Sequence, residues 1–372
     1  MPRRPISGAD VAARRIVNQH LAKQSVATGT EIVGSLAAVQ AQDYVGAKWG
    51  IALRTTGATD ADIEREVSEG RIVRTHILRP TWHFVAASDL RWMLELTAPR
   101  VRMAVASYDR KLGIDADVRR QMRNVVVQAL RGGKHLTRAE LAEELTKNAV
   151  RADGTQRLAH LMIHAELDGL ICSGPRRGKQ FTYRLVDECI PPTRYLMRDV
   201  ALHNLATRYF TTRGPATEND FAWWSGLTMA DARNAVNSVD NLESEIIGGR
   251  TYWFIPARVS QRKPTAALLP AYDEYLVSYA DRSATQRRVK PEKVGETFSF
   301  LGRYVIIVDG QIVGSWKGAA NRDLVSVALE PLTRLTRAEL DAVEEQAERF
   351  AKFLGLPFQM VWAKRKASTR RL

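Results

Sequence analysis

The chain of 372 residues is 45% hydrophobic and 26% charged, which is typical of an ordinary soluble protein with about two to four compact units. Its formal net charge of +14 favours a polyanionic partner, and nucleic acid is the commonest one. Cys172 and Cys189 lack Cys-x-x-Cys spacing, which excludes a cysteine-based zinc site, and no signal sequence or apolar run of roughly 18 residues is present, so we expect no membrane span and a cytoplasmic location.

The first 110 residues read as helices followed by a hairpin. A helix is predicted at 10–23, and Thr28 or Thr30 caps a second helix that ends in Gln40, Ala41 and Gln42. Two short helices and two strands follow, at 46–54, 59–69, 71–78 and 81–86. Proline at position 80 stiffens the turn between the strands. This order is typical of a winged helix.

Residues 111–190 show the same order most clearly. Val118, Met122 and Val126 lie on one face of a helix, Thr137 begins a second through a capping box, and a third helix follows. Strands at 170–173 and 180–186 flank a basic turn. Its side chains either contact phosphates or form a solvated turn, and they include Arg176, Arg177 and Lys179.

Residues 191–262 repeat the order a third time, with a hairpin turning on Gly248 and Gly249. From residue 263 short strands dominate; they are predicted at 266–269, 274–279, 298–300, 304–308 and 311–317. Asp309 and Gly310 form the turn between the last two. A helix at 336–354, a strand at 358–362 and a basic tail at 364–372 end the chain.

We therefore expect an α+β, mostly helical fold. Three tandem winged-helix units occupy residues 1–110, 111–190 and 191–262, and a small β-barrel-like domain with a C-terminal helix occupies 263–372. Tandem units of this kind can follow a longer stretch of duplex than one unit can.

Gln40 and Gln42 are the first candidates for chemistry. Two residues apart, their side chains face the same way on a strand or an irregular turn, not on a helix. Each amide offers a donor and an acceptor, so the pair can hold one water from two sides without carrying charge. The alternative is that they cap the helix or face solvent.

The segment Val39-Gln40-Ala41-Gln42-Asp43 resembles the Gln-x-Gln motif of the AlkZ/YcaQ DNA glycosylases, a group of tandem winged-helix proteins. Stretches at 76–85, 269–276 with 281–283, and 308–316 match in the same order. Glutamine at the second motif position is similar to the AlkZ branch rather than the aspartate of the YcaQ branch. The resemblance implies that both glutamines place the attacking water, that Thr81 and His83 lie near the catalytic cleft, and that a barrel hairpin, here the one turning at Asp309, approaches the duplex.

The residues themselves leave several roles open. His83 can equally be a satisfied core histidine, and Arg79 either holds a phosphate beside the lesion or decorates a turn. Asp43 can contribute to the site, although a cap or turn residue is the preferred interpretation. Asp273 and Glu274 read as structural, with Asp273 the better functional candidate because it ends a loop led by proline. His160 and His164 are spaced to share a metal, but no third ligand follows at zinc-site spacing.

The predicted function is that of a monofunctional DNA glycosylase acting as a monomer on damaged double-stranded DNA. Its substrates would be bulky or cross-linking alkylated purines of the N7-alkylguanine type, and no metal or cofactor is expected. The alternative is a winged-helix protein that binds duplex DNA without catalysis, as a regulator does.

Overall fold

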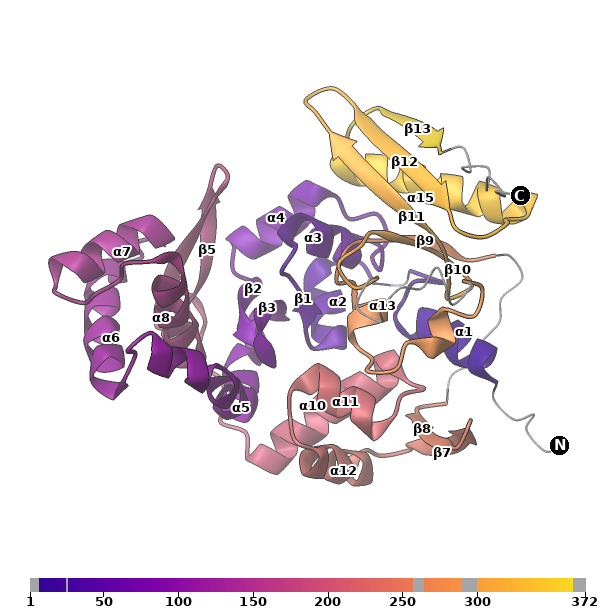
Figure 1. Ribbon diagram of the computed structural model, residues 1–372. Helices are drawn as coiled ribbons and strands as arrows, with labels where there is room; N and C mark the ends of the chain where they lie inside the picture. Colours follow the sequence, from indigo (N-terminus) through magenta and orange to yellow (C-terminus); the bar gives the residue numbers. More distant parts are fainter. Residues whose placement is uncertain (1–6, 25, 257–263, 290–299, 364–372) are drawn as a thin grey trace, which may run out of the picture.

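The computed structural model describes residues 7–24, 26–256, 264–289 and 300–363. Its N-terminal part contains four helices and a three-stranded sheet of order β1-β3-β2 (Figure 1). The elements are α1 (Gly8–Asn18), α2 (Gly29–Leu36), β1 (Val39–Gln40), α3 (Tyr44–Ala52), α4 (Asp60–Ser68), β2 (Ile72–Ile77) and β3 (Arg79–Ala86). Ser7, Thr28 and Thr59 each begin a helix through a capping box, so Thr28 rather than Thr30 caps α2.

The helix before the Gln-x-Gln motif ends earlier than predicted. It stops at Leu36, and Ala37 then adopts a positive φ of 61°. Gln40 pairs with β3 instead of continuing the helix. Cross-strand pairing therefore decides the conformation of the motif, and helical spacing of the apolar residues before it does not.

The next part begins with a long helix that packs against β2 and β3 and continues into a compact unit at the left of Figure 1. Its elements are η1 (Ala87–Asp89), α5 (Leu90–Lys111), α6 (Ala116–Leu130), β4 (Leu136–Thr137), α7 (Arg138–Lys147), α8 (Thr155–Leu167), β5 (Ile171–Arg177), β6 (Gln180–Leu185) and α9 (Val186–Cys189). Most of the buried apolar residues of this unit form their own cluster between residues 114 and 185, while Ile163, Leu167, Cys172, Val186 and Ile190 pack into a cluster shared with other parts of the chain. The predicted order of helices and hairpin is present.

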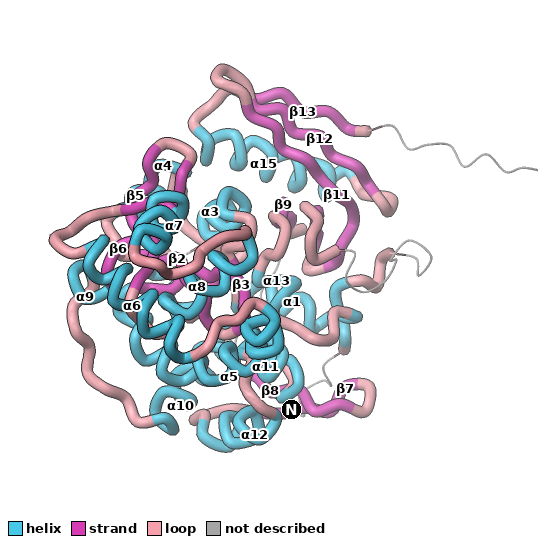
Figure 2. The backbone as a smooth tube through the Cα atoms, turned by 60° about the vertical axis from the view of Figure 1, so that its left-hand side comes forward, coloured by secondary structure: helices cyan, strands magenta, loops and turns pink. Residues whose placement is uncertain are grey.

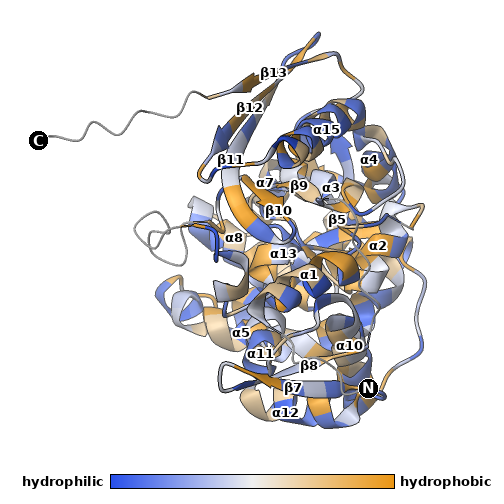
Figure 3. Ribbon diagram, turned by 90° about the vertical axis from the view of Figure 1, so that its right-hand side faces the viewer, coloured by the Kyte–Doolittle hydropathy of each residue, from blue (hydrophilic) through white to orange (hydrophobic). Residues whose placement is uncertain are grey.

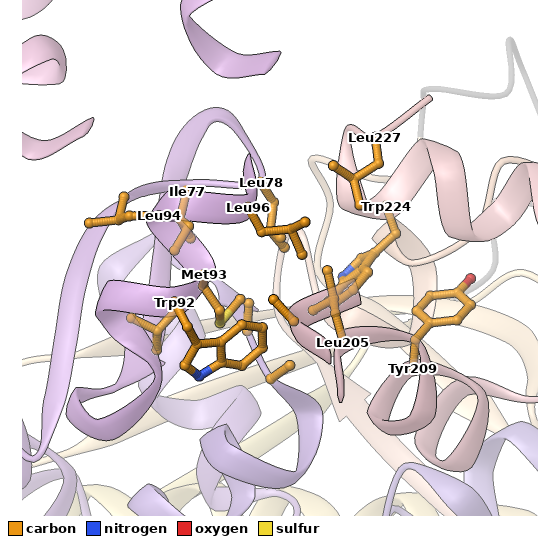
Figure 4. Close-up of a cluster of buried hydrophobic side chains, with 14 of the residues drawn as sticks. Ile77, Leu78, Trp92, Met93, Leu94, Leu96, Leu205, Tyr209, Trp224 and Leu227 are labelled. Carbon is orange, nitrogen blue, oxygen red and sulfur yellow. The ribbon is translucent and has the colours of Figure 1, made fainter. Parts of the chain in front are cut away.

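The third stretch also has the predicted order, but it has no separate core. Its elements are α10 (Arg198–Arg213), α11 (Glu218–Ser225), α12 (Met229–Ser238), β7 (Glu243–Ile247) and β8 (Arg250–Phe254). Figure 4 shows Leu205, Trp224 and Leu227 beside Ile77 and Leu78 from the first part. One apolar cluster thus crosses all three predicted unit boundaries, since it also includes Ile163 and Tyr279, and this shared packing brings α10 against α2, which precedes the motif.

The C-terminal part is an open sheet of order β13-β12-β11-β10-β9, with α15 as a second layer beside it (Figure 2). Its elements are β9 (Ala266–Leu269), α13 (Glu274–Val277), η2 (Ser283–Thr285), β10 (Val305–Val308), β11 (Gln311–Ala320), β12 (Val325–Pro331), α15 (Arg337–Leu354) and β13 (Phe358–Trp362). The sheet does not close into a barrel within the described residues, so the barrel-like prediction is corrected here. Helices α15 and α3 cover its apolar face through Phe350 and Trp49, and burial therefore needs no closure.

The strand predicted at 274–279 is also wrong, because residues 274–277 form the single-turn helix α13. Asp273 caps it, and its four side chains are all buried because neighbouring elements surround the turn. Strand β12 was not predicted. Residues 298–299 of another predicted strand and the basic tail lie outside the described residues.

Figure 3 shows the outward face of α15 as largely hydrophilic, as expected for a helix that lies on a sheet with one side in water. Within the part of the chain that is described, no helix combines the length and the apolar character needed to cross a bilayer.

Candidate active site

Strand pairing brings the first motif glutamine into a row of polar side chains. Gln40 lies directly opposite His83 in the β1–β3 pair, and His83 lies opposite Thr75 in the β3–β2 pair. Directly opposed residues share one face of an antiparallel sheet. Arg79 and Thr81 alternate with His83 along β3 and so belong to the same face. The sheet therefore gathers five polar residues beside the motif.

Each of these five side chains carries a buried polar atom that no described protein group satisfies. The atoms are Gln40 Oε1, Thr75 Oγ1, Arg79 Nε and Nη2, Thr81 Oγ1 and His83 Nε2. Buried polar groups in folded proteins are nearly always paired, with protein or with ordered water. A cluster of such atoms marks a place that can take a hydrogen-bonding ligand.

His83 is fully buried and can accept a hydrogen bond within this row. Its Nδ1 lies 2.9 Å from the carbonyl oxygen of Thr81, and since that oxygen only accepts, Nδ1 carries the proton. Nε2 is then an acceptor. Burial, together with the nearby charge of Arg79, lowers the pKa of His83 to about 3, so the ring is neutral at pH 7. A core histidine would have both ring nitrogens hydrogen-bonded to protein. In His83 only Nδ1 is, and Nε2 has no partner among the described residues.

Gln42 lies against the same stretch of β3 but in solvent. Its Oε1 is 3.5 Å from the backbone nitrogen of Trp82, a long contact, and the residue is exposed. Gln40 is 9% exposed, so it lies at the boundary between core and surface. The structure therefore brings both glutamines to the segment of β3 that also carries Thr81 and His83.

Arg79 does not simply decorate a turn. It follows Leu78, whose φ is 62°, and Gly226 approaches so closely that a Cβ there would lie 2.2 Å from the Leu78 carbonyl oxygen. Burial lowers the pKa of Arg79, and the charge of Glu274 partly opposes that effect. Its Nε and Nη2 are buried donors that have no acceptor among the described residues.

Asp43 begins α3, as the preferred interpretation predicted. Its side chain accepts a hydrogen bond from the Gly46 nitrogen at 3.1 Å, and Tyr304 donates a second, short one. Because Tyr304 belongs to the C-terminal part, Asp43 connects the motif's end to the open sheet.

The two consecutive carboxylates at 273 and 274 take different partners. Asp273 forms a two-point ion pair with Arg54, at 2.8 and 2.9 Å, and accepts from the Tyr275 nitrogen. Glu274 accepts from the backbone nitrogen of Gln40 at 2.8 Å and from Arg213 at 2.7 Å. The residue in contact with the motif is thus Glu274, whereas the contacts of Asp273 are with Arg54 and the Tyr275 nitrogen.

Glu274 is ionised in this setting. Burial alone would raise its pKa, but the charge of Arg213 and hydrogen bonds from Arg213, Gln40 and Ser278 outweigh that effect and lower it to about 2. Sequence reasoning named Glu274 but missed its role, since the residue is 234 positions from Gln40. The signal available was its place in the matching stretch 269–276.

The turn at Asp309 packs into the protein. Gly310 accepts a hydrogen bond from the Tyr275 hydroxyl at 2.9 Å, and a Cβ on Gly310 would lie 2.8 Å from the Ala12 carbonyl oxygen. The Asp309 side chain accepts from the Thr265 nitrogen at 2.8 Å. Gly310 therefore lies against α1 and α13, whereas Asp309 is exposed, and the approach of this hairpin to a duplex stays a prediction.

The basic turn between β5 and β6 lies beside α3 and α4. Arg176 is 3.7 Å from Glu64, and its guanidinium lies 5.1 Å from the ring centres of both Tyr44 and Phe181. Arg177 pairs with Glu140, and Lys179 is exposed. Residues 174–184 contain no acidic residue, so the carboxylates that pair with these arginines come from other elements.

His160 and His164 both contact one carboxylate, that of Asp109, at 2.8 and 2.9 Å. No group of three or more possible ligands that could hold a metal occurs among the described residues. This arrangement ties α8 to α5.

Comparison with known proteins decides the family. Residues 33–353 match the family described as DNA glycosylase AlkZ-like. The chain belongs to the AlkZ-like DNA glycosylase family. An interstrand DNA cross-link repair glycosylase of Streptomyces sahachiroi is 25% identical over 377 residues, covering 95% of this chain and 99% of that protein.

The solved structure of Streptomyces sahachiroi DNA glycosylase AlkZ shares the fold. It has a TM-score of 0.78 and 22% identity, with 96% of this chain and 100% of that chain covered. Membership of the AlkZ-like family confirms the resemblance inferred from the motifs and the enzyme class, DNA glycosylase. Gln40, Arg79, His83, Arg213 and Glu274 all fall inside the matched residues.

Proposed function

We propose that this AlkZ-like family member is a monofunctional glycosylase that excises bulky or cross-linking alkylated purines, of the N7-alkylguanine type, from double-stranded DNA. The water that attacks the sugar is held by Gln40 and Gln42. One observation carries the proposal: Gln40 lies opposite His83 in a row of buried polar side chains that the described protein does not satisfy.

The chemistry of this substrate needs few protein groups. A glycosylase extrudes one nucleotide and breaks the bond between sugar and base. Alkylation at N7 makes the purine cationic, so it departs as a neutral base without a protein acid. The remaining needs are a water on the far side of the sugar and an environment that tolerates positive charge there.

The residues of the row fit those needs. Gln40 Oε1 and His83 Nε2 are both acceptors, so a water that donates to both directs its lone pair away from the protein. The amide of Gln42 approaches from the solvent side. Since His83 is neutral at pH 7, neither it nor the glutamines repel a cationic base.

Arg79 supports the binding of an extruded nucleotide. Its unsatisfied Nε and Nη2 can donate to a backbone phosphate beside the lesion. The net charge of +14 supports double-stranded DNA as the partner. The cross-link repair activity in the printed name of the Streptomyces sahachiroi relative supports cross-linking adducts as substrates.

The test is release of base from duplex DNA treated with a nitrogen mustard, measured as abasic sites under single-turnover conditions with saturating protein. We expect Gln40→Ala and Gln42→Ala each to lower the rate about 100-fold or more, a loss typical of removing one preorganised hydrogen-bonding group. Affinity for the duplex should change little, because neither amide carries charge.

Gln311→Ala is the matched control, since Gln311 is 8% exposed and its amide bonds to Ala284 and Arg287 and not to the motif. It should keep the wild-type rate. If the wild type and both motif variants release base only at the background rate while duplex binding persists, the protein is the non-catalytic DNA binder and the glycosylase proposal fails.

A further inference from the structure

The backbone that carries Gln40 is held by one buried ion pair. Arg213 donates to the carbonyl oxygens of Leu36 and Ala38, at 2.9 and 3.1 Å, and to Glu274 at 2.7 Å. Glu274 in turn accepts from the Gln40 nitrogen at 2.8 Å. Both charged side chains are 0% exposed. The pair thus grips the same short segment at three points, on both sides of the chain.

The segment needs such a grip because it is strained. Ala37 has φ 61° and ψ −46°, and the Ala38 nitrogen donates to the Leu36 carbonyl oxygen at 2.7 Å. This geometry is a γ-turn of the rare, strained hand, which a non-glycine residue adopts only when its surroundings enforce it. Strained backbone of this kind gathers at functional sites. Arg213 adds a second donor to the Leu36 carbonyl oxygen and also satisfies the carbonyl oxygen of Ala38, which follows the end of α2.

The pair is itself fixed by elements far apart in the chain. Glu274 accepts from Trp224 Nε1 at 3.0 Å and from Ser278 Oγ at 2.7 Å, and Arg213 donates from Nε to Ser278 at 2.7 Å. Contacts from α10, α11 and the end of α13 therefore converge on the motif. The Glu274 carboxylate is 0% exposed and accepts four hydrogen bonds from protein groups, so we expect it to have no contact with substrate.

We infer that Arg213 and Glu274 are positioning residues, whose buried pair enforces the strained turn at Ala37 and sets Gln40 opposite His83 for attack by the bound water. This inference rests on the proposed function. The pair acts through the backbone at Gln40 and Ala38, and neither residue takes part in the reaction itself.

A matched control lies one residue away. Asp273 and Arg54 form a second buried pair, with side chains 2% and 1% exposed. Arg54 also bonds to the Gly50 carbonyl oxygen and to Gln19, and so ties α3 to α1. Both pairs are buried, both join an arginine to a carboxylate, and the two carboxylates are consecutive in the chain. They differ in that only Glu274 bonds to the backbone of Gln40.

The experiment compares Glu274→Gln with Asp273→Asn in the full chain. Each change leaves a buried arginine without its counter-charge, so both should lower the unfolding temperature by similar amounts. A carboxamide cannot accept hydrogen bonds at both ends, so in Glu274→Gln either the Gln40 nitrogen or Arg213 loses its acceptor. At a temperature where all proteins are folded, we expect the single-turnover rate to fall at least 30-fold in Glu274→Gln and less than threefold in Asp273→Asn.

A second readout does not depend on catalysis. Hydrogen–deuterium exchange of peptides covering residues 36–42 should speed up at least tenfold in Glu274→Gln, because either the Gln40 amide or Arg213, which holds the same segment, loses its acceptor, and should stay as in wild type in Asp273→Asn. Should Glu274→Gln fail to fold, Arg213→Lys against Arg54→Lys serves the same comparison, since lysine keeps the charge but lacks the planar fork that reaches several acceptors.

Equal effects of the two changes on both rate and exchange would overturn the inference. If the wild type shows no glycosylase activity, the exchange result still decides whether the pair holds the motif. A failure of the proposed function is therefore distinguishable from a failure of the positioning role of Arg213 and Glu274.

Discussion

The unit at 111–190 and the site around Gln40 are built in opposite ways. The unit's apolar cluster consists of its own residues, and Thr137 begins α7 by a local capping box. The Gln40 site depends on a partner 234 positions away and on an arginine that bonds to Leu36 across 177 positions. The unit is therefore held by local patterns, whereas the site is held by buried polar contacts between distant segments. Stability and catalytic geometry should respond to different substitutions.

The largest effect should come from the core of the local unit. Leu161→Ala removes a fully buried side chain from α8, and we expect it to lower the free energy of unfolding by about 2–5 kcal/mol. The single-turnover rate at saturating protein should remain within threefold, because this core holds no site residue. Urea unfolding and the abasic-site assay measure the two quantities.

Leu205→Ala is the counterpart, since Leu205 is equally buried but lies on α10, which carries Arg213 (Figure 4). It should cost similar stability and also lower the rate about tenfold. If both substitutions change the rate equally, the contrast between the two regions does not hold.

A second prediction concerns pH and His83. The pKa of His83 is about 3 when folded and near 6.5 when unfolded. Between these values the unfolded chain binds a proton that the folded protein does not, so stability falls as the pH drops from 6.5 towards 3. We expect this to contribute on the order of a few kcal/mol.

His83→Asn should flatten the dependence of the free energy of unfolding on pH between 6.5 and 4.5, measured by urea unfolding at each pH. The slopes are compared rather than the absolute stabilities, because the substitution also removes the contact with Thr81. A slope equal to that of the wild type would mean that His83 is accessible to protons in the folded protein.

The smallest effect should come from the exposed turn of the local unit. Arg177 is 49% exposed and pairs with Glu140. Arg177→Ala should change stability by less than about 1 kcal/mol. If the turn contacts a phosphate, the slope of log Kd against log salt should fall by about 1 while the rate at saturation is retained.

Arg337→Ala is the control for loss of one positive charge, since Arg337 is exposed and paired with Asp341 on α15. An identical salt slope for both variants would assign Arg177 to a solvated turn, the alternative interpretation of this segment.

The elements that local chemistry dictates were predictable. The capping box at Thr137, the Asp309 turn and the helix at 337–354 need only neighbouring residues, and the sequence shows them directly. The open form of the C-terminal sheet was not predictable, because the helices that cover its apolar face include α3 from the first part of the chain. The helix at 274–277 was missed for the same reason: a turn buried on all sides has no polar face to reveal its period.

For the site, the amino-acid sequence by itself supplied the candidates for the proposed chemistry: two amides, a histidine, a threonine and an arginine on two short segments. Only the tertiary structure decided that Gln40 lies opposite His83, that Gly310 packs against Tyr275, and that Glu274 rather than Asp273 bonds to the motif. The reason is physical. Strand pairing and buried hydrogen bonds act between segments far apart in the chain, and no local spacing encodes which of two adjacent carboxylates such a partner will reach.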